Sequence, residues 1–223
     1  MRKLALVFLW LLASPGSAAA DDAVPDSMFI GILPCAECPA IDYRLDLFDD
    51  GVYYLRASYR ERGQRHDEMG QWSLAENDSV LQLHSPDASK TLLSMDAPEK
   101  LTLLDGGGRP IESAQNYSLF RSELLAPIAP SIQIDGMFVY YADSALFRAC
   151  VTNRKMPVAM EGDYIALEHA WLESGRSIKS PLFARIEARI EPRVNMEGPR
   201  RPTVIVERLI STQAAGACPK SGP

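Results

Sequence analysis

The sequence predicts an all-β protein of two domains, and three observations lead to this prediction. Short segments of alternating apolar and polar residues recur at spacings of about 8 to 12 residues, and Gly, Asn and Asp turn signals separate them. Only one segment has the period of a helix. The length of 223 residues suits one large or two small domains, and 47% hydrophobic and 23% charged residues are typical of a folded chain.

The first half is predicted to be a set of short antiparallel strands. Residues 41–47 alternate apolar with charged side chains, and Asp49-Asp50-Gly51 then turns the chain into a strand at 52–59. The same reasoning predicts further strands over 69–74, 80–83, 101–104 and 117–120. Without helices between them, such strands form an antiparallel sandwich or a small closed barrel.

A linker is predicted over 124–131, because Pro127 and Pro130 hold the chain extended and neither can continue a strand ladder. Beyond it, strands are predicted over 136–142, 158–160, 183–191 and 203–210. In the third of these, the inward residues are expected to be Ala184, Ile186, Ala188 and Ile190.

One amphipathic helix is predicted between the second and third of these strands. Its apolar residues are Tyr164, Leu167, Trp171 and Leu172, with Asp163 as the expected N-cap and Gly175 as the stop. One helix in a β domain of this size fits a five-stranded OB-fold barrel. The expected boundaries are therefore 21–123 for the first domain and 132–223 for the OB-fold domain.

The N-terminus predicts export to the periplasm. Arg2 and Lys3 precede the apolar run Leu4–Ala13, and small residues lead to Ala20, which is the pattern of a signal peptide over residues 1–20. No later segment is apolar enough over about 20 residues to span a bilayer. The first cysteine is Cys35, so no lipobox cysteine is present and a lipid anchor is not expected.

Charge and motifs narrow the function classes. The chain has 23 Lys and Arg against 29 Asp and Glu, and this acidic balance argues against nucleic acid as a partner. No Gly-x-Ser-x-Gly, phosphate loop or His-Glu-x-x-His is present, so an enzyme is not expected. Asp42, Asp46, Asp49 and Asp50 form an acidic run, which is interpreted as solvated charge on a strand and a turn rather than a hydrolase pair.

Two stretches of sequence resemble a known family. Residues 31–42, which contain Pro34-Cys35-Ala36-Glu37-Cys38-Pro39, and Asp50-Gly51-Val52-Tyr53 resemble the N-terminal domain of the NlpE family. Residues 136–147, Cys150, Pro157-Val158-Ala159 and Met196-Glu197-Gly198 resemble its C-terminal OB domain.

The resemblance implies a short lipocalin-like β-barrel followed by the OB-fold, with one disulfide within the N-terminal cysteine pair and one between Cys150 and Cys218. It also implies a non-enzymatic role in copper resistance or envelope-stress sensing, through contacts with an envelope stress sensor or another envelope protein. Family members are typically outer-membrane lipoproteins that signal to the Cpx system, and the missing lipobox cysteine departs from that pattern.

The pair Cys35 and Cys38 has three interpretations: a structural disulfide, a metal site or a redox-catalytic site. An oxidising compartment favours the disulfide, and no helix begins at the pair to activate a thiolate, which argues against a thiol-disulfide oxidoreductase. Two reduced thiolates suit Cu(I), so Cys35 and Cys38 are candidate copper ligands only when reduced, and no cofactor is required. His66, His84, Met28 and Met69 are not clustered with the pair in sequence.

A second alternative function is a lipocalin-like carrier. In that case Tyr53, Tyr54, Tyr59 and Trp72 would line a pocket for a small apolar ligand. Barrels of this size are usually filled by their own side chains, so these residues are predicted to be core.

Overall fold

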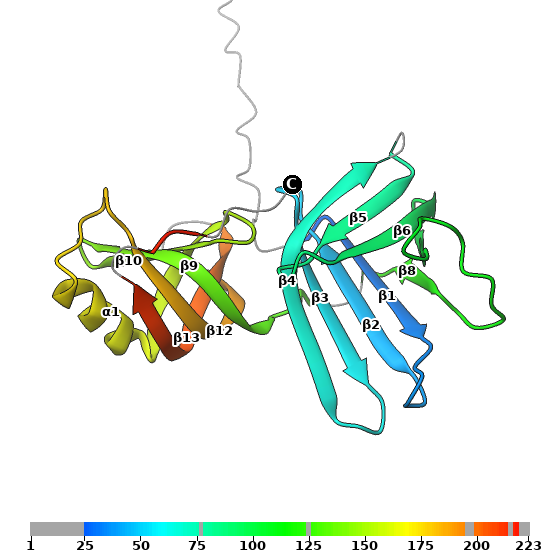
Figure 1. The fold of residues 1–223 in the computed structure, drawn as a ribbon, viewed down its shortest axis with the longest axis horizontal. Helices are drawn as coiled ribbons and strands as arrows, with labels where there is room; N and C mark the ends of the chain where they lie inside the picture. Colours follow the sequence, from blue (N-terminus) through cyan, green and yellow to red (C-terminus); the bar gives the residue numbers. More distant parts are fainter. Residues whose placement is uncertain (1–24, 76–77, 124–125, 195–198, 214–215, 219–223) are drawn as a thin grey trace, which may run out of the picture.

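The chain folds into two β-barrels that lie side by side (Figure 1). The computed structural model describes residues 25–75, 78–123, 126–194, 199–213 and 216–218. The predicted signal peptide over 1–20 lies outside these residues, as do Met196-Glu197-Gly198.

The first barrel is an up-and-down meander of eight antiparallel strands, closed by pairing of the first strand with the last. Closure confirms the barrel and excludes the sandwich. Two of its strands, β1 and β6, are missing from the sequence prediction. The strands are β1 (Ser27–Leu33), β2 (Ile41–Leu47), β3 (Val52–Tyr59), β4 (Gln64–Ala75), β5 (Val80–His84), β6 (Lys90–Ala97), β7 (Lys100–Leu103) and β8 (Ser118–Arg121).

The interior of the first barrel is filled by its own side chains. Tyr53 is fully buried there, and Trp72 and Tyr59 pack against the same cluster from partly buried positions. The remaining buried members of this cluster are Phe29, Leu33, Leu45, Leu47, Leu55, Ala57, Leu81, Leu83, Leu93, Leu101 and Leu119. A filled interior argues against the carrier hypothesis, which needs room for a ligand among these aromatic residues.

The second barrel has five strands in the spatial order β10-β11-β13-β12-β9. β11 pairs in parallel with β13, and α1 lies between β11 and β12 along the chain, as expected for an OB-fold with one helix. The elements are β9 (Ser131–Tyr141), β10 (Ser144–Ala149), β11 (Lys155–Gly162), α1 (Tyr164–Glu173), β12 (Leu182–Val194) and β13 (Arg200–Gln213).

Side-chain alternation in β12 is confirmed, and the helix needs two corrections. Ala184, Ile186, Ala188 and Ile190 are all buried. Leu172 is 58% exposed, because residues seven and eight after Tyr164 cannot both face a narrow contact with the barrel. The Asp163 side chain makes no cap hydrogen bond, and its Oδ2 instead accepts the Leu209 N–H at 2.8 Å.

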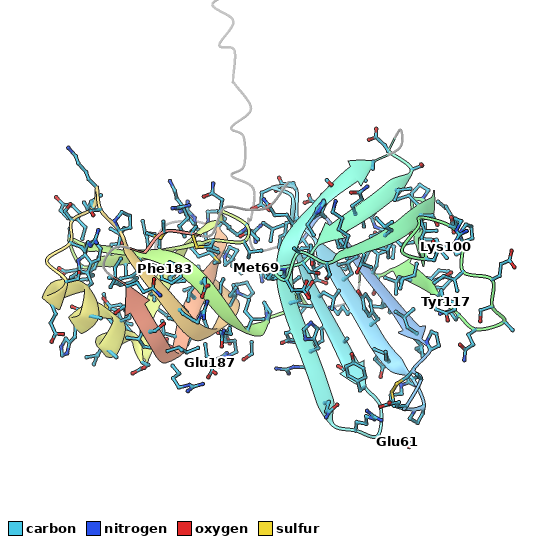
Figure 2. All side chains as sticks on the ribbon, in the orientation of Figure 1. Glu61, Met69, Lys100, Tyr117, Phe183 and Glu187 are labelled. Carbon is cyan, nitrogen blue, oxygen red and sulfur yellow. A yellow bond between two sulfur atoms is a disulfide. The ribbon has the colours of Figure 1, made fainter. Side chains whose placement is uncertain are left out.

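Among the described residues, no helix is long and apolar enough to cross a membrane. The side chains that decorate both barrels are drawn in Figure 2, where the loop that carries the first disulfide lies near Glu61.

Candidate functional site

The first cysteine pair lies in the loop between β1 and β2. Cys35 and Cys38 are bonded to each other, with their Cα atoms 5.2 Å apart, and both are partly exposed. Pro34 and Pro39 flank the pair, and the next element is the strand β2. The Arg62 guanidinium donates to the Glu37 backbone oxygen at 2.7 Å, which fixes this loop to the turn between β3 and β4.

In the part of the chain that the structure describes, no third His, Cys, Asp or Glu ligand lies beside this pair. Among the described residues, no group of three or more His, Cys, Asp and Glu side chains is placed to hold a metal ion. His66 and His84 lie instead in a groove between the barrels, and Met69 is buried beside it. Met28 lies near the opposite end of β1, where the Arg44 guanidinium contacts its sulfur.

The second pair joins two distant parts of the OB-fold domain. Cys150, in the turn after β10, is bonded to Cys218, which lies 68 positions later and beyond the last strand. The Cys150 N–H also donates to the Asp135 backbone oxygen on β9 at 2.8 Å. The turn that carries Cys150 is therefore fixed on both sides, and it faces the first barrel across the groove.

The two barrels share one apolar junction. Phe48, Val52, Tyr54 and Met69 of the first barrel belong to the same buried cluster as the core of the OB-fold domain. Ile128 of the linker is 1% exposed and is part of this cluster. The outer face of the first barrel is thus covered here by the linker and the second domain.

The prediction that the acidic run is solvated is wrong for Asp46. Its side chain is 0% exposed, and its Oδ2 accepts the Ile128 N–H at 2.6 Å while Arg44 lies beside it at 3.2 Å. Burial raises the pKa of Asp46, although the hydrogen bond from Ile128 and the charge of Arg44 oppose this. Asp46 does point out of the barrel, but the linker covers it.

Asp67 holds the linker in a similar way. Burial favours its neutral form, but hydrogen bonds from Arg56, at 2.7 and 2.8 Å, and from the Ser131 N–H, at 3.0 Å, keep the pKa of Asp67 below its ordinary value. Arg56 also donates to the Ala129 backbone oxygen at 2.8 Å. The linker backbone is therefore bound by charged side chains of the first barrel.

Arg154 completes the junction from the OB-fold side. Its side chain is 8% exposed, and it donates to both carboxylate oxygens of Asp50 at 2.6 and 2.7 Å and to the Tyr54 hydroxyl at 3.1 Å. Its guanidinium lies 4.5 Å from the centroid of the Phe48 ring. Although burial favours its neutral form, Tyr54 and Asp50 keep the pKa of Arg154 above its ordinary value.

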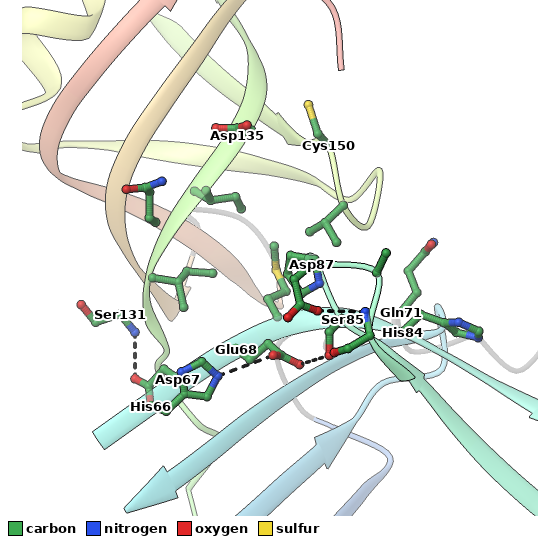
Figure 3. Close-up of a pocket in the computed structure, with 18 of the residues that line it drawn as sticks. His66, Asp67, Glu68, Gln71, His84, Ser85, Asp87, Ser131, Asp135 and Cys150 are labelled. Carbon is green, nitrogen blue, oxygen red and sulfur yellow. Dashed lines mark hydrogen bonds and ion pairs between the residues drawn. The ribbon is translucent and has the colours of Figure 1, made fainter. Parts of the chain in front are cut away.

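A groove of about 1000 Å³ lies beside this junction (Figure 3). One wall is formed by β4 and the turn between β5 and β6, and the other by the start of β9 and the turn at Cys150. Within it, Glu68 accepts hydrogen bonds from Tyr53 and from the Ser85 hydroxyl, and His66 lies 3.5 Å from its other oxygen. No motif in the sequence indicates this groove, since its walls come from both domains.

The fold and the cysteine pairs define a two-barrel β protein in which an eight-stranded barrel precedes an OB-fold, with one disulfide in each. Models of known protein families identify the family to which this chain belongs. The NlpE N-terminal domain matches residues 29–114, and the NlpE C-terminal OB domain matches residues 128–219. The chain therefore belongs to the NlpE family.

A curated relative agrees with this assignment, and two solved structures are also similar to this chain. Lipoprotein NlpE of Escherichia coli (strain K12) is 32% identical over 177 residues, which is 78% of this chain and 72% of the relative. The crystal structure of the Cpx pathway activator NlpE from Escherichia coli has 25% identity and a TM-score of 0.38, and the match covers 86% of this chain and 97% of that one. A putative lipoprotein from Shewanella oneidensis has 27% identity and a TM-score of 0.38, covering 49% of this chain and 100% of that one.

Proposed function

We propose that this protein acts in the periplasm in the envelope stress response, without catalysing a reaction, and signals to the Cpx pathway through contacts with other envelope proteins. The observation that carries the proposal is that the models of both NlpE domains match this chain in order. The NlpE of Escherichia coli is described as the Cpx pathway activator.

The experiment is a Cpx-dependent reporter in cells that lack their own copy of the gene. Expression of this chain should raise the reporter output in a strain with an intact Cpx sensor. It should leave the output unchanged in a strain without that sensor. Equal output with and without the chain would contradict the proposed function.

We further propose that the pair Cys35 and Cys38 is the redox-sensitive part of the first domain. Its partial exposure supports this, since a reductant can reach it. Replacement of both residues by serine should shift the reporter output under reducing conditions. The matched control is Ser113→Ala, an exposed substitution in the same domain.

Copper is a second candidate input, supported by the preference of Cu(I) for thiolates. Because the cysteines are bonded to each other, copper would bind only after reduction. Titration of the purified protein with Cu(I) and a competing chelator should show binding after reduction, and none before it. Unchanged affinity in the variant with both cysteines replaced by serine would assign the copper to another place.

A further inference from the structure

The start of β9 has an unpaired edge. From Ser131 onward β9 pairs with β12 on one side, but on the other side it pairs with β10 only from Gly136 onward. Residues 131–135 therefore pair with a single strand, β12, among the described residues. A strand edge of this kind presents backbone groups that another extended chain can pair with.

The backbone direction along this edge follows from two hydrogen bonds. The Ser131 N–H donates to Asp67, and the Asp135 backbone oxygen accepts from the Cys150 N–H. The backbone N–H and C=O groups of both residues therefore point away from β12. Because backbone groups of alternate residues in a strand point to the same side, the N–H and C=O of Gln133 point the same way. Gln133 is exposed, and it lines the groove.

A second unpaired edge forms the opposite wall. β4 pairs with β3 over Gln64–Gln71 but with β5 only from Gln71 onward, so residues 64–69 pair with no second strand among the described residues. Figure 3 shows His66 and Glu68 of β4 across the groove from Asp135 of β9. The groove volume of about 1000 Å³ provides room for a short extended segment.

The side chains of the groove favour a segment with apolar residues and one acid. Ile132 and Val151, which are partly exposed, supply apolar surface. Arg65 and Arg185 are each paired with a carboxylate, at 3.4 and 2.6 Å. Lys90 lines the groove without an acidic partner among the described residues, so it is available to an acidic residue of a ligand.

We propose that this groove binds an extended segment of a partner protein, which pairs with β9 as an added strand and places an acidic side chain at Lys90. The inference rests on the proposed function for the class of partner, an envelope protein. The site itself is defined by the backbone edge at Gln133. The bound segment pairs with the backbone N–H and C=O of Gln133, because the Ser131 N–H and the Asp135 C=O on the same edge are already bonded to Asp67 and Cys150.

The test uses full-length mature protein and synthetic peptides of about nine residues. Each peptide alternates valine with threonine, carries one glutamate at a different position and has blocked ends. Binding is measured by fluorescence anisotropy. At least one peptide should bind, and the same peptide with methyl groups on alternate amide nitrogens should bind more weakly, because it cannot pair with the edge.

Variants locate the binding. Gln133→Pro removes the N–H on the free edge without removing a bond to β12, and it should weaken binding about tenfold, the equivalent of one hydrogen bond. Gln133→Ala keeps the N–H and should bind as the natural protein does. Lys90→Glu should weaken binding, whereas Lys179→Glu, an exposed charge change elsewhere, should not.

The remaining outcomes overturn the inference. These are absence of binding by every peptide at millimolar concentration, equal binding by the folded Gln133→Pro variant, or a dimer that Gln133→Pro abolishes, which would assign the edge to a second copy. Circular dichroism of each variant verifies its fold, and Lys90→Glu keeps the test decisive if Gln133→Pro does not fold. A positive Cpx reporter together with failed peptide binding would leave the proposed function standing and remove the groove.

Discussion

Arg154 contacts three different groups of the first barrel from the OB-fold side. It lies four positions after Cys150, and one guanidinium contacts a carboxylate, a hydroxyl and an aromatic ring of the other domain. Removing it leaves the Tyr54 hydroxyl and Asp50 without these donors. A residue so placed links the turn of the second disulfide to the first barrel.

We predict that Arg154→Met lowers the free energy of unfolding by about 2 kcal/mol, discounted for the partial exposure of Asp50. Urea denaturation measures this, and X-ray scattering should show an increased radius of gyration because the barrels separate. The matched control is Arg148→Met, whose guanidinium donates to Asn153 within its own turn. An unchanged radius with full stability would contradict the role of Arg154 at the junction.

Asp67 gives the junction a dependence on pH. Its pKa is lowered from the ordinary 3.8, so the folded state favours the carboxylate. Its stabilising contribution is present above pH 3.8 and is lost as the pH falls through the lowered pKa. The raised pKa of Asp46 acts in the opposite direction, since its charged form is disfavoured by folding.

We therefore predict that Asp67→Asn destabilises the protein by about 1 to 3 kcal/mol at neutral pH, and that the difference from the natural protein shrinks as the pH falls below the ordinary value. Urea denaturation at a series of pH values measures both. Asp49→Asn, in an exposed turn, is the control and should show no comparable change. A difference that is constant with pH would assign the effect to packing instead.

At the scale of elements, close packing in the OB-fold core depends on Gly136 in β9. A methyl group there would lie 2.2 Å from the Phe147 ring and 2.7 Å from the Arg148 backbone oxygen. We predict that Gly136→Ala lowers the melting temperature, because the backbones of β9 and β10 must shift apart. Gly106→Ala has open space around it and should melt as the natural protein does.

The elements also show what a sequence pattern can and cannot reveal. β12 is predictable because its alternation reflects one barrel interior, and the buried Ala184 and Ile186 follow directly from it. β1 is missed because Ile30 and Ile32 are exposed apolar residues, which obscure its alternation. The burial of Asp46 and the position of Tyr54 on the outer face were not predictable for a different reason. The linker and the second domain cover that face, and the pattern within one strand does not indicate such a contact.

At the scale of the whole molecule, the two disulfides differ in what they restrain. The first closes a loop with a sequence separation of 3, whereas the second spans 68 positions and encloses β11, α1, β12 and β13. In the chain-entropy model the stabilisation grows with the logarithm of the loop length. The second bond should therefore stabilise the fold more than the first.

We predict that replacing both Cys150 and Cys218 by serine lowers the free energy of unfolding by up to about 4 kcal/mol, and that the same change at Cys35 and Cys38 costs about half as much. Urea denaturation of the two double variants compares them directly, and each is the control for the other. Cys150 also borders the groove. The variant without Cys150 and Cys218 should therefore lose order in the turn that carries Arg154, and hydrogen exchange should increase in this turn and at the junction. Equal losses in the two variants would mean that local contacts, rather than loop length, determine what each bond contributes.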